Sequence, residues 1–225
     1  IGGFVDMVSR VVSLDSIESP GVPALPLAPV AYEQRYQDTT NNILRQYFTT
    51  LQNVFQSLLS EDGGRFIRFP YGAFSSDQDQ TATANTATLM TLNTTDFSSG
   101  VSISSSKITV ATGGIYNLQF SAQLENSNNA PQDVYIWLKQ NGTDIVGSTG
   151  VIGMPARKNP GDPSHDIKGW NYFLSMTAGQ YVEIYWSTTS VDVSIQFYAA
   201  SGSPTKPATQ SVVATMTFVS ALPTI

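Results

Sequence analysis

The residues best suited to chemistry in this sequence lie in the segment from Asn159 to Gly169, which reads NPGDPSHDIKG. His165 is the single histidine of the chain, so a serine–histidine–aspartate arrangement or a histidine metal site would have to use it. Asp162, His165 and Asp166 could bind a cation through two carboxylates and an imidazole. The simpler interpretation, which we prefer, is a solvent-exposed loop rich in Pro and Gly between two strands.

Other candidates for catalysis are weak. Asp77 and Asp79 in the string SSDQDQ form a second possible cluster of oxygen ligands, but their setting is that of a polar turn. A glycosidase needs two acids that face one cleft, and the 17 acidic residues are scattered with no pair at a strand end. No Gly-rich phosphate loop follows a strand and opens a helix. We therefore expect a protein that is not an enzyme and that uses no cofactor and no metal ion.

Aromatic residues set among amides and hydroxyls are the chemistry of a sugar-binding surface. Trp170, Tyr172 and Tyr198 are the candidates for such glycan contact. The alternative is that these rings fill the core of a β domain or the axis of an oligomer.

The composition limits the possible partners. Only 12% of the 225 residues are charged, about half of the usual 25% or so, while one residue in three is Ser, Thr, Asn or Gln. With 11 Lys and Arg residues and a net charge of -6, we expect no nucleic-acid partner. No stretch approaches the ~18 consecutive apolar residues of a membrane-spanning helix, so we expect no membrane insertion. The absence of Cys excludes disulfides and thiolate metal sites.

The first 30 residues differ from the rest. Residues 1–19 carry a modest apolar pattern, and Pro20, Pro23, Pro26 and Pro29 then follow at a spacing of three. Such spacing favours an extended polyproline conformation and cannot continue a helix. We interpret residues 1–30 as an extended N-terminal arm with a semi-rigid strap, which is either a linker or a tether that docks on a neighbour.

Residues 31–62 are predicted to form one long amphipathic helix. Its apolar residues recur at steps of four and three, the spacing of a heptad seam. The seam residues are Leu44, Phe48, Leu51, Phe55 and Leu58. Gly63 and Gly64 end the helix. The seam packs either on the chain's own domain or on copies of itself, and we favour self-association as a stem.

From residue 63 to residue 225 the apolar residues alternate with polar ones, and turn residues recur every 8–15 positions. This pattern predicts eight to ten antiparallel strands in a sandwich or barrel. The clearest strand is 114–124, and Asn141-Gly142 predicts a tight hairpin. Segments 133–139 and 180–187 are apolar on both faces, which implies that a second sheet, the helix or another chain covers the outer face. The predicted residues of the head core or its interface are Tyr116, Leu118, Phe120, Trp137, Tyr181, Tyr185 and Trp186.

An ordered set of motifs resembles a known family. The string TDFSSGVSISSSKITVATGGIYNLQFSAQL, followed by VYIWLKQNGTDI and LSMTAGQYVEIYW, is similar to the globular heads of complement components and of the tumour necrosis factor superfamily. Lys107, Ile108, Thr109, Val110, Gly114, Tyr116, Leu118 and Phe120 occupy the positions of the family's central strands. The resemblance spans about residues 71–219 and implies a ten-strand antiparallel jelly-roll sandwich that assembles as a homotrimer.

A second resemblance covers about residues 30–125. RYQDTTNNILRQYFTTLQNVFQSLLS, running into Tyr-Gly-Ala-Phe, looks like small virion proteins of tailed bacteriophages, notably those infecting marine cyanobacteria. In such proteins a short helical stem precedes a jelly-roll head. The chain departs from the immune ligands because it has no Cys, no collagen-like Gly repeat and no secretory segment.

The two resemblances predict a bacteriophage virion structural protein at the particle surface, on the capsid or the tail. It would be a homotrimeric fibre, spike or tail-associated adhesin, anchored to other virion proteins through residues 1–30 and able to contact host surface polysaccharide. A capsid decoration (cement) protein is the alternative within this class. A secreted lectin or ligand of the complement-head type, and a glycan-active enzyme that depends on His165, are the alternatives from other classes.

Overall fold

The computed structural model describes residues 21–59 and 69–222, with the side chains of residues 57–59 left aside. The chain divides into two compact units, Ile1–Arg68 and Phe69–Ile225. Each unit is described by itself below.

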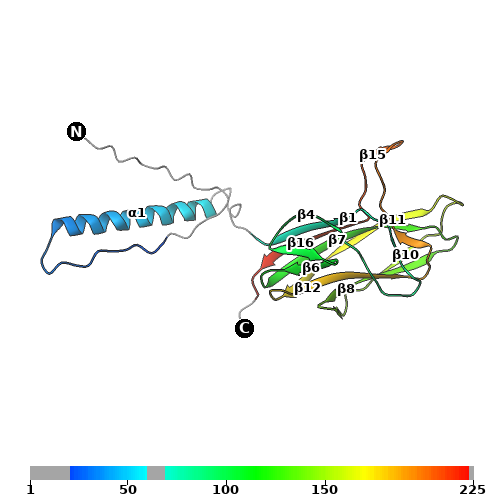
Figure 1. Cartoon of the computed structure of the whole chain (residues 1–225), viewed down its shortest axis with the longest axis horizontal. Helices are drawn as coiled ribbons and strands as arrows, with labels where there is room; N and C mark the ends of the chain where they lie inside the picture. Colours follow the sequence, from blue (N-terminus) through cyan, green and yellow to red (C-terminus); the bar gives the residue numbers. More distant parts are fainter. Residues whose placement is uncertain (1–20, 60–68, 223–225) are drawn as a thin grey trace. The chain divides into compact units, whose positions relative to one another are not determined.

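The described residues of the first unit contain one helix, α1 (Gln34–Leu59), within the predicted range 31–62 (Figure 1). Neither Gly nor Pro interrupts these 26 residues. The predicted end of the helix at Gly63 and Gly64 lies outside the described residues. Thr39, Thr40, Thr49 and Thr50 each return their hydroxyl to the backbone carbonyl four residues earlier, which satisfies polar groups that would otherwise compete with the helix. Residues 21–29 form neither helix nor strand. No helix in the described ranges has the length and apolarity to cross a membrane.

The second unit, the head, consists of two stacked antiparallel sheets and a small separate hairpin (Figure 1). We name the layer that contains β7 (Gly114–Asn126) sheet A. It also contains β1 (Tyr71–Ser76), β2 (Gln80–Thr81), β4 (Thr94–Ser99), β11 (Ser164–Met176), β13 (Val193–Ile195) and β16 (Val212–Ser220). Sheet B contains β3 (Thr88–Leu89), β5 (Val101–Ser104), β6 (Lys107–Val110), β8 (Gln132–Gln140), β9 (Thr143–Asp144), β10 (Gly150–Met154) and β12 (Tyr181–Thr188). The separate hairpin pairs β14 (Ser201–Gly202) with β15 (Thr205–Lys206).

The chain crosses repeatedly between the two layers, so most neighbouring strands in a sheet are distant in sequence. Strand β7 pairs with β11 along its whole length on one side, and with β16 and β13 on the other. The Asn-Gly turn forms as predicted, because Asn141 and Gly142 both adopt positive φ angles between β8 and β9. The predicted mainly β antiparallel sandwich with one preceding helix is thus confirmed.

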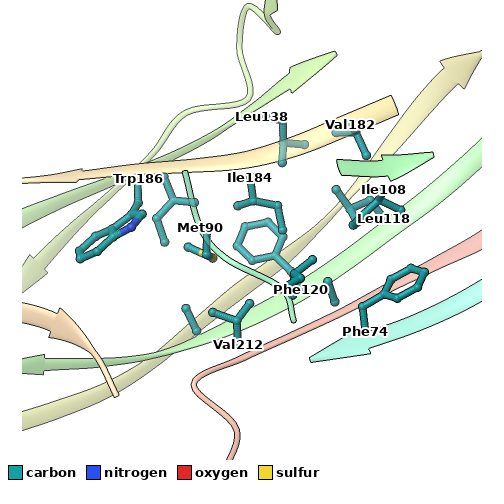
Figure 2. Close-up of a cluster of buried hydrophobic side chains, with 14 of the residues drawn as sticks. Phe74, Met90, Ile108, Leu118, Phe120, Leu138, Val182, Ile184, Trp186 and Val212 are labelled. Carbon is teal, nitrogen blue, oxygen red and sulfur yellow. The ribbon is translucent and has the colours of Figure 1, made fainter. Parts of the chain in front are cut away.

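Strict alternation along β7 builds the core. Tyr116, Leu118 and Phe120 are buried on the inner side of β7. Figure 2 shows Leu118 and Phe120 together with Leu138 and Trp186 of sheet B. All five are at most 5% exposed. Of the predicted head residues, Tyr116, Leu118, Phe120 and Trp186 therefore lie in the core, whereas Trp137, Tyr181 and Tyr185 are half-buried on the opposite face of their strands.

The described residues form more strands than the ten predicted, for two reasons. Several segments of only two residues pair briefly with longer strands. In addition, β4 carries the polar string TTDFSS, which is tolerated because β4 is an edge strand with most of its residues exposed. Sequence alternation also missed β10, whose five residues include two glycines.

Candidate functional site

The prediction that residues 159–169 form a loop is wrong for its second half. Strand β11 begins at Ser164, so His165 lies within the sheet, opposite Glu125 of β7. Asp166 follows on the other face of the strand, where its carboxylate forms an ion pair of 2.9 Å with Lys168. His165 and Asp166 therefore point away from one another and cannot share a cation. Within the described residues there is no group of three His, Asp or Glu side chains that could hold a metal ion.

Asp77 and Asp79 act as local hydrogen-bond acceptors. The Asp77 carboxylate accepts from the Asn93 side-chain amide at 2.6 Å, and the Asp79 carboxylate accepts from the backbone N–H of Phe197 at 2.8 Å. Both bonds tie the turn between β1 and β2 to neighbouring segments. This is the polar-turn interpretation rather than an oxygen cluster for a cation.

The three aromatic residues predicted to contact glycans do not share one surface. Trp170 and Tyr172 lie on the core side of β11 and are partly buried. The Trp170 ring packs on Phe120 with 4.7 Å between centroids, and a side chain at Gly150 of β10 would collide with it. Trp170 thus seals the edge of the sandwich. Tyr198 instead lies over the outer face of sheet A.

Tyr198 belongs to a small polar network on that outer face. Its hydroxyl donates a hydrogen bond of 2.8 Å to the Glu125 carboxylate and lies 2.9 Å from Nδ1 of His165. When the hydroxyl donates to Glu125, the Nδ1–H group of His165 is the donor to the Tyr198 oxygen. Burial raises the pKa of Tyr198 above its ordinary value of 10.0, and the bond to Glu125 and the charges of Glu125 and Asp79 raise it further.

Sequence reasoning identified His165 and Tyr198 separately but missed Glu125 and the link between them. The alternation of residues 114–124, continued by one position, places Glu125 on the outer face of β7. Its partner on β11 lies 40 residues later, and local alternation contains no signal for that pairing.

The outer face of sheet A also exposes apolar side chains. Side chains on this face alternate with the buried ones, at the odd-numbered positions of β7, β11 and β16. Its large exposed apolar residues are Tyr71, Phe97, Ile167, Phe173 and Val213. Phe173 is 57% exposed and Phe97 is 63% exposed. We call this surface the A face.

A buried polar atom lies within the A face. Phe173 of β11, Asn117 of β7 and Thr217 of β16 are register partners across the sheet. The side-chain oxygen Oδ1 of Asn117 is buried and has no hydrogen-bond partner in the described structure. Buried acceptors without a partner are rare in native proteins, because leaving one unpaired costs about 1–3 kcal/mol of stability.

The outer face of sheet B is different. The Nζ atoms of Lys107 and Lys139 lie 4.4 Å from the ring centroids of Tyr181 and Tyr185, respectively. Trp137 donates its indole N–H to Asp144 at 2.7 Å. Two of the aromatic rings that made these strands apolar on both faces, Tyr181 and Tyr185, are thus covered by lysine side chains of the same sheet rather than by another element.

The helix seam is mostly uncovered. Leu44 and Leu51 are partly buried, whereas Phe48 is 60% exposed and Phe55 is 52% exposed. The side chain of Leu58 lies outside the described residues. The proline strap approaches a different side of the helix, where it borders a shallow hollow lined by Gly21, Pro23, Ile43, Gln46, Tyr47 and Thr50.

The fold and its surfaces define a class of protein: a mainly β, two-sheet antiparallel sandwich preceded by an amphipathic helix. No protein-family model and no curated protein matches the chain. Among solved structures, the chain is similar to the globular domain of the zebrafish complement 1qA protein, with 11% sequence identity and a TM-score of 0.40. The match covers 69% of this chain and 100% of the complement domain.

Proposed function

We propose that this chain is a non-enzymatic structural protein of a tailed-phage virion and that three copies assemble through the A face and the helix seam. The observation that carries the proposal is that several large apolar side chains, among them Phe173 and Phe97, are more than half exposed on one face of the head. Soluble monomers rarely leave a large contiguous apolar patch in water. A second and third copy of the same chain would cover it.

The helix supports the same conclusion independently. Phe48 and Phe55 lie one heptad apart on α1 and are more than half exposed, as expected for a seam that other helices cover. Most of the stability of a helix in a protein comes from packing of its amphipathic face, so an uncovered seam favours a partner. The sequence motifs that resemble complement and tumour necrosis factor heads favour three copies over two.

The role at the particle surface is mechanical and adhesive. Residues 1–30 anchor the trimer to other virion proteins, and the head faces outward, where it can contact host surface polysaccharide. Because the A face buries mostly apolar and amide groups, its contacts depend little on salt. The low charged fraction of 12% fits an assembly that is held by apolar contact rather than by ion pairs.

The assembly is tested by size-exclusion chromatography with light scattering on the full chain. We expect a particle of three times the chain mass of 24.3 kDa at micromolar concentration. A mass of 24.3 kDa across the whole accessible concentration range would refute the trimer.

The place on the particle needs a separate experiment. Gold-labelled antibodies against the head are imaged on purified virions, and we expect labels on the tail or its fibres. Labels spread over the capsid shell would instead favour a decoration protein, and unlabelled virions would refute the virion assignment. In the same system, unchanged incorporation of a chain that lacks residues 1–30 would show that the anchor lies elsewhere.

A further inference from the structure

A small β-hairpin projects from the head. We define the projecting hairpin as residues 199–208, which contain β14 and β15 (Figure 1). These two strands form a sheet of their own and pair with no strand of sheet A or sheet B. Most of the hairpin is exposed, and a side chain at Gly202 would meet no other atom within 4 Å. The hairpin therefore has little contact with the head beyond its base.

The base of the hairpin is firmly attached. Tyr198 and Thr209 exchange two backbone hydrogen bonds of 3.1 and 2.8 Å. The Tyr198 hydroxyl is bonded to Glu125, and the Nζ atom of Lys206 donates to the carbonyl of Ala199 at 3.2 Å. The same Nζ lies 5.3 Å from the centroid of the Tyr198 ring. A projection that is fixed at its base loses less conformational entropy on docking than a loose loop does.

The hairpin is rooted on the A face. Glu125 and His165, which hold Tyr198, have the same strand parity as the exposed Ile167 and Phe173. In Figure 1 the hairpin extends on the side of sheet A, away from sheet B. It thus rises from the surface that the proposed function covers with another copy of the chain.

We infer that the projecting hairpin clasps the neighbouring copy in the trimer. A copy that covers the A face as far as its Glu125 and His165 end meets the hairpin there, and the hydrogen bonds at the hairpin's base oppose its displacement. This inference rests on the proposed function and adds the segment that fixes how the copies sit on one another.

The composition of the hairpin suits this contact. Apart from Lys206 its side chains are small or cyclic, with Ser203 and Pro204 at the tip, so a neighbouring backbone can approach closely. Lys206 is its only charged residue, and Lys206 is already used at the base. The clasp therefore consists of van der Waals contacts and backbone hydrogen bonds rather than ion pairs.

The inference is tested by the reactivity of a single cysteine at the tip. Because the chain contains no Cys, the Ser203→Cys variant carries one thiol. Its rate of reaction with a maleimide is measured above and below the concentration at which the trimer dissociates. We expect a rate at least ~10-fold lower in the trimer, since burial excludes the reagent. The control is Ser102→Cys, at an exposed position of β5 in sheet B, whose rate should not change.

A second variant tests the contribution to assembly. Residues 200–207 are replaced by the two-residue turn Asn-Gly, which closes a hairpin without a projection. We expect trimers to dissociate at a concentration at least ~10-fold higher, with the unfolding midpoint of the monomer unchanged.

The outcomes separate this inference from the proposed function. If the wild-type chain is trimeric but the thiol at position 203 reacts as fast as the control and the shortened chain assembles normally, the clasp is refuted and the trimer stands. If the wild-type chain is monomeric throughout, both are refuted. Protection of the thiol only in whole virions would assign the hairpin to a different virion protein and would also refute the clasp.

Discussion

Replacing Phe173 with Ser should dissociate the trimer while leaving the head folded. Phe173 lies on the outer side of β11, where 57% of its surface is exposed. It contributes nothing to the core cluster, so the monomer loses little packing. Its register partner Asn117 carries an unpaired buried oxygen, and a smaller neighbour lets water reach that atom.

The expected loss follows from the exposed area. A Phe side chain offers about 150–250 Å², so the exposed part of Phe173 is on the order of 100 Å². At about 25 cal/mol per Å², its burial contributes roughly 2.5 kcal/mol in each copy, or about 7 kcal/mol in a trimer. Because each 1.4 kcal/mol is a factor of ten, the overall dissociation constant should rise by about five orders of magnitude. The concentration at half assembly then rises a few hundredfold.

The assay is sedimentation velocity or light scattering over a dilution series, with unfolding in denaturant as a check on the fold. The matched control is Val146→Ser, since Val146 is 96% exposed but lies in the loop after β9, away from the A face. Trimers of the Phe173→Ser chain that persist at the same concentration as the wild type would refute the assignment of the A face. Equal weakening by the control would show that general loss of apolar surface, not this face, is responsible.

Three further experiments test other parts of the structure. Gly169→Ala should destabilise the head by about 2–3 kcal/mol in denaturant unfolding, because a Cβ atom there overlaps the backbone of β7. Its control, Gly153→Ala, should be neutral or slightly stabilising, because the nearest atom to an added Cβ lies 3.9 Å away. Equal unfolding midpoints of the two variants would contradict this. Leu51→Asp combined with Phe55→Asp should weaken assembly with helix content by circular dichroism retained, and an unchanged mass would mean that the seam is not a contact between copies. The folded state raises the pKa of Tyr198, so the contribution of its neutral hydroxyl to stability is fully present below pH 10.0 and is lost as the pH rises above that value. Wild-type unfolding midpoints should therefore drop from pH 9 to 11 more steeply than those of the Tyr198→Phe variant. Parallel curves would refute the assignment.

Local alternation predicted the parts of the head whose two faces differ in polarity. Along β7, Tyr116, Leu118 and Phe120 alternate with Asn117 and Gln119, and burial follows that alternation residue by residue. The Asn-Gly turn was predictable because its backbone requires positive φ angles that few other residue pairs accept. The helix was predictable because apolar residues spaced by four and three match the helical period and not the two-residue alternation of a strand.

The pairing of strands was not predictable in the same way. His165 lies in a strand because β7 offers a free edge along its whole length, and that edge belongs to a segment 40 residues earlier. Nothing within residues 159–169 carries this information, and the prolines and glycines there favoured a loop. The polar network of Tyr198, Glu125 and His165 joins three such distant segments, so only the folded chain brings it together.

The two outer faces of the sandwich differ in how their apolar groups are covered, and this difference bears on function. On sheet B, Lys107 and Lys139 cover Tyr181 and Tyr185, so that face needs no partner to shield its rings.

On the A face, by contrast, the only Asp, Glu, Lys, Arg or His side chains that β7, β11 and β16 present are Glu125 and His165, at the end where the projecting hairpin is rooted. Phe173 therefore has no charged neighbour on these strands that could cover it as the lysines do on sheet B. Two lysines of the head thus lie over aromatic rings on sheet B. The A face, from which a second copy would exclude water under the proposed function, has no such lysines on β7, β11 and β16. Under the proposed function, low charge suits the A face in particular, because an unpaired charge buried between copies would cost several kcal/mol.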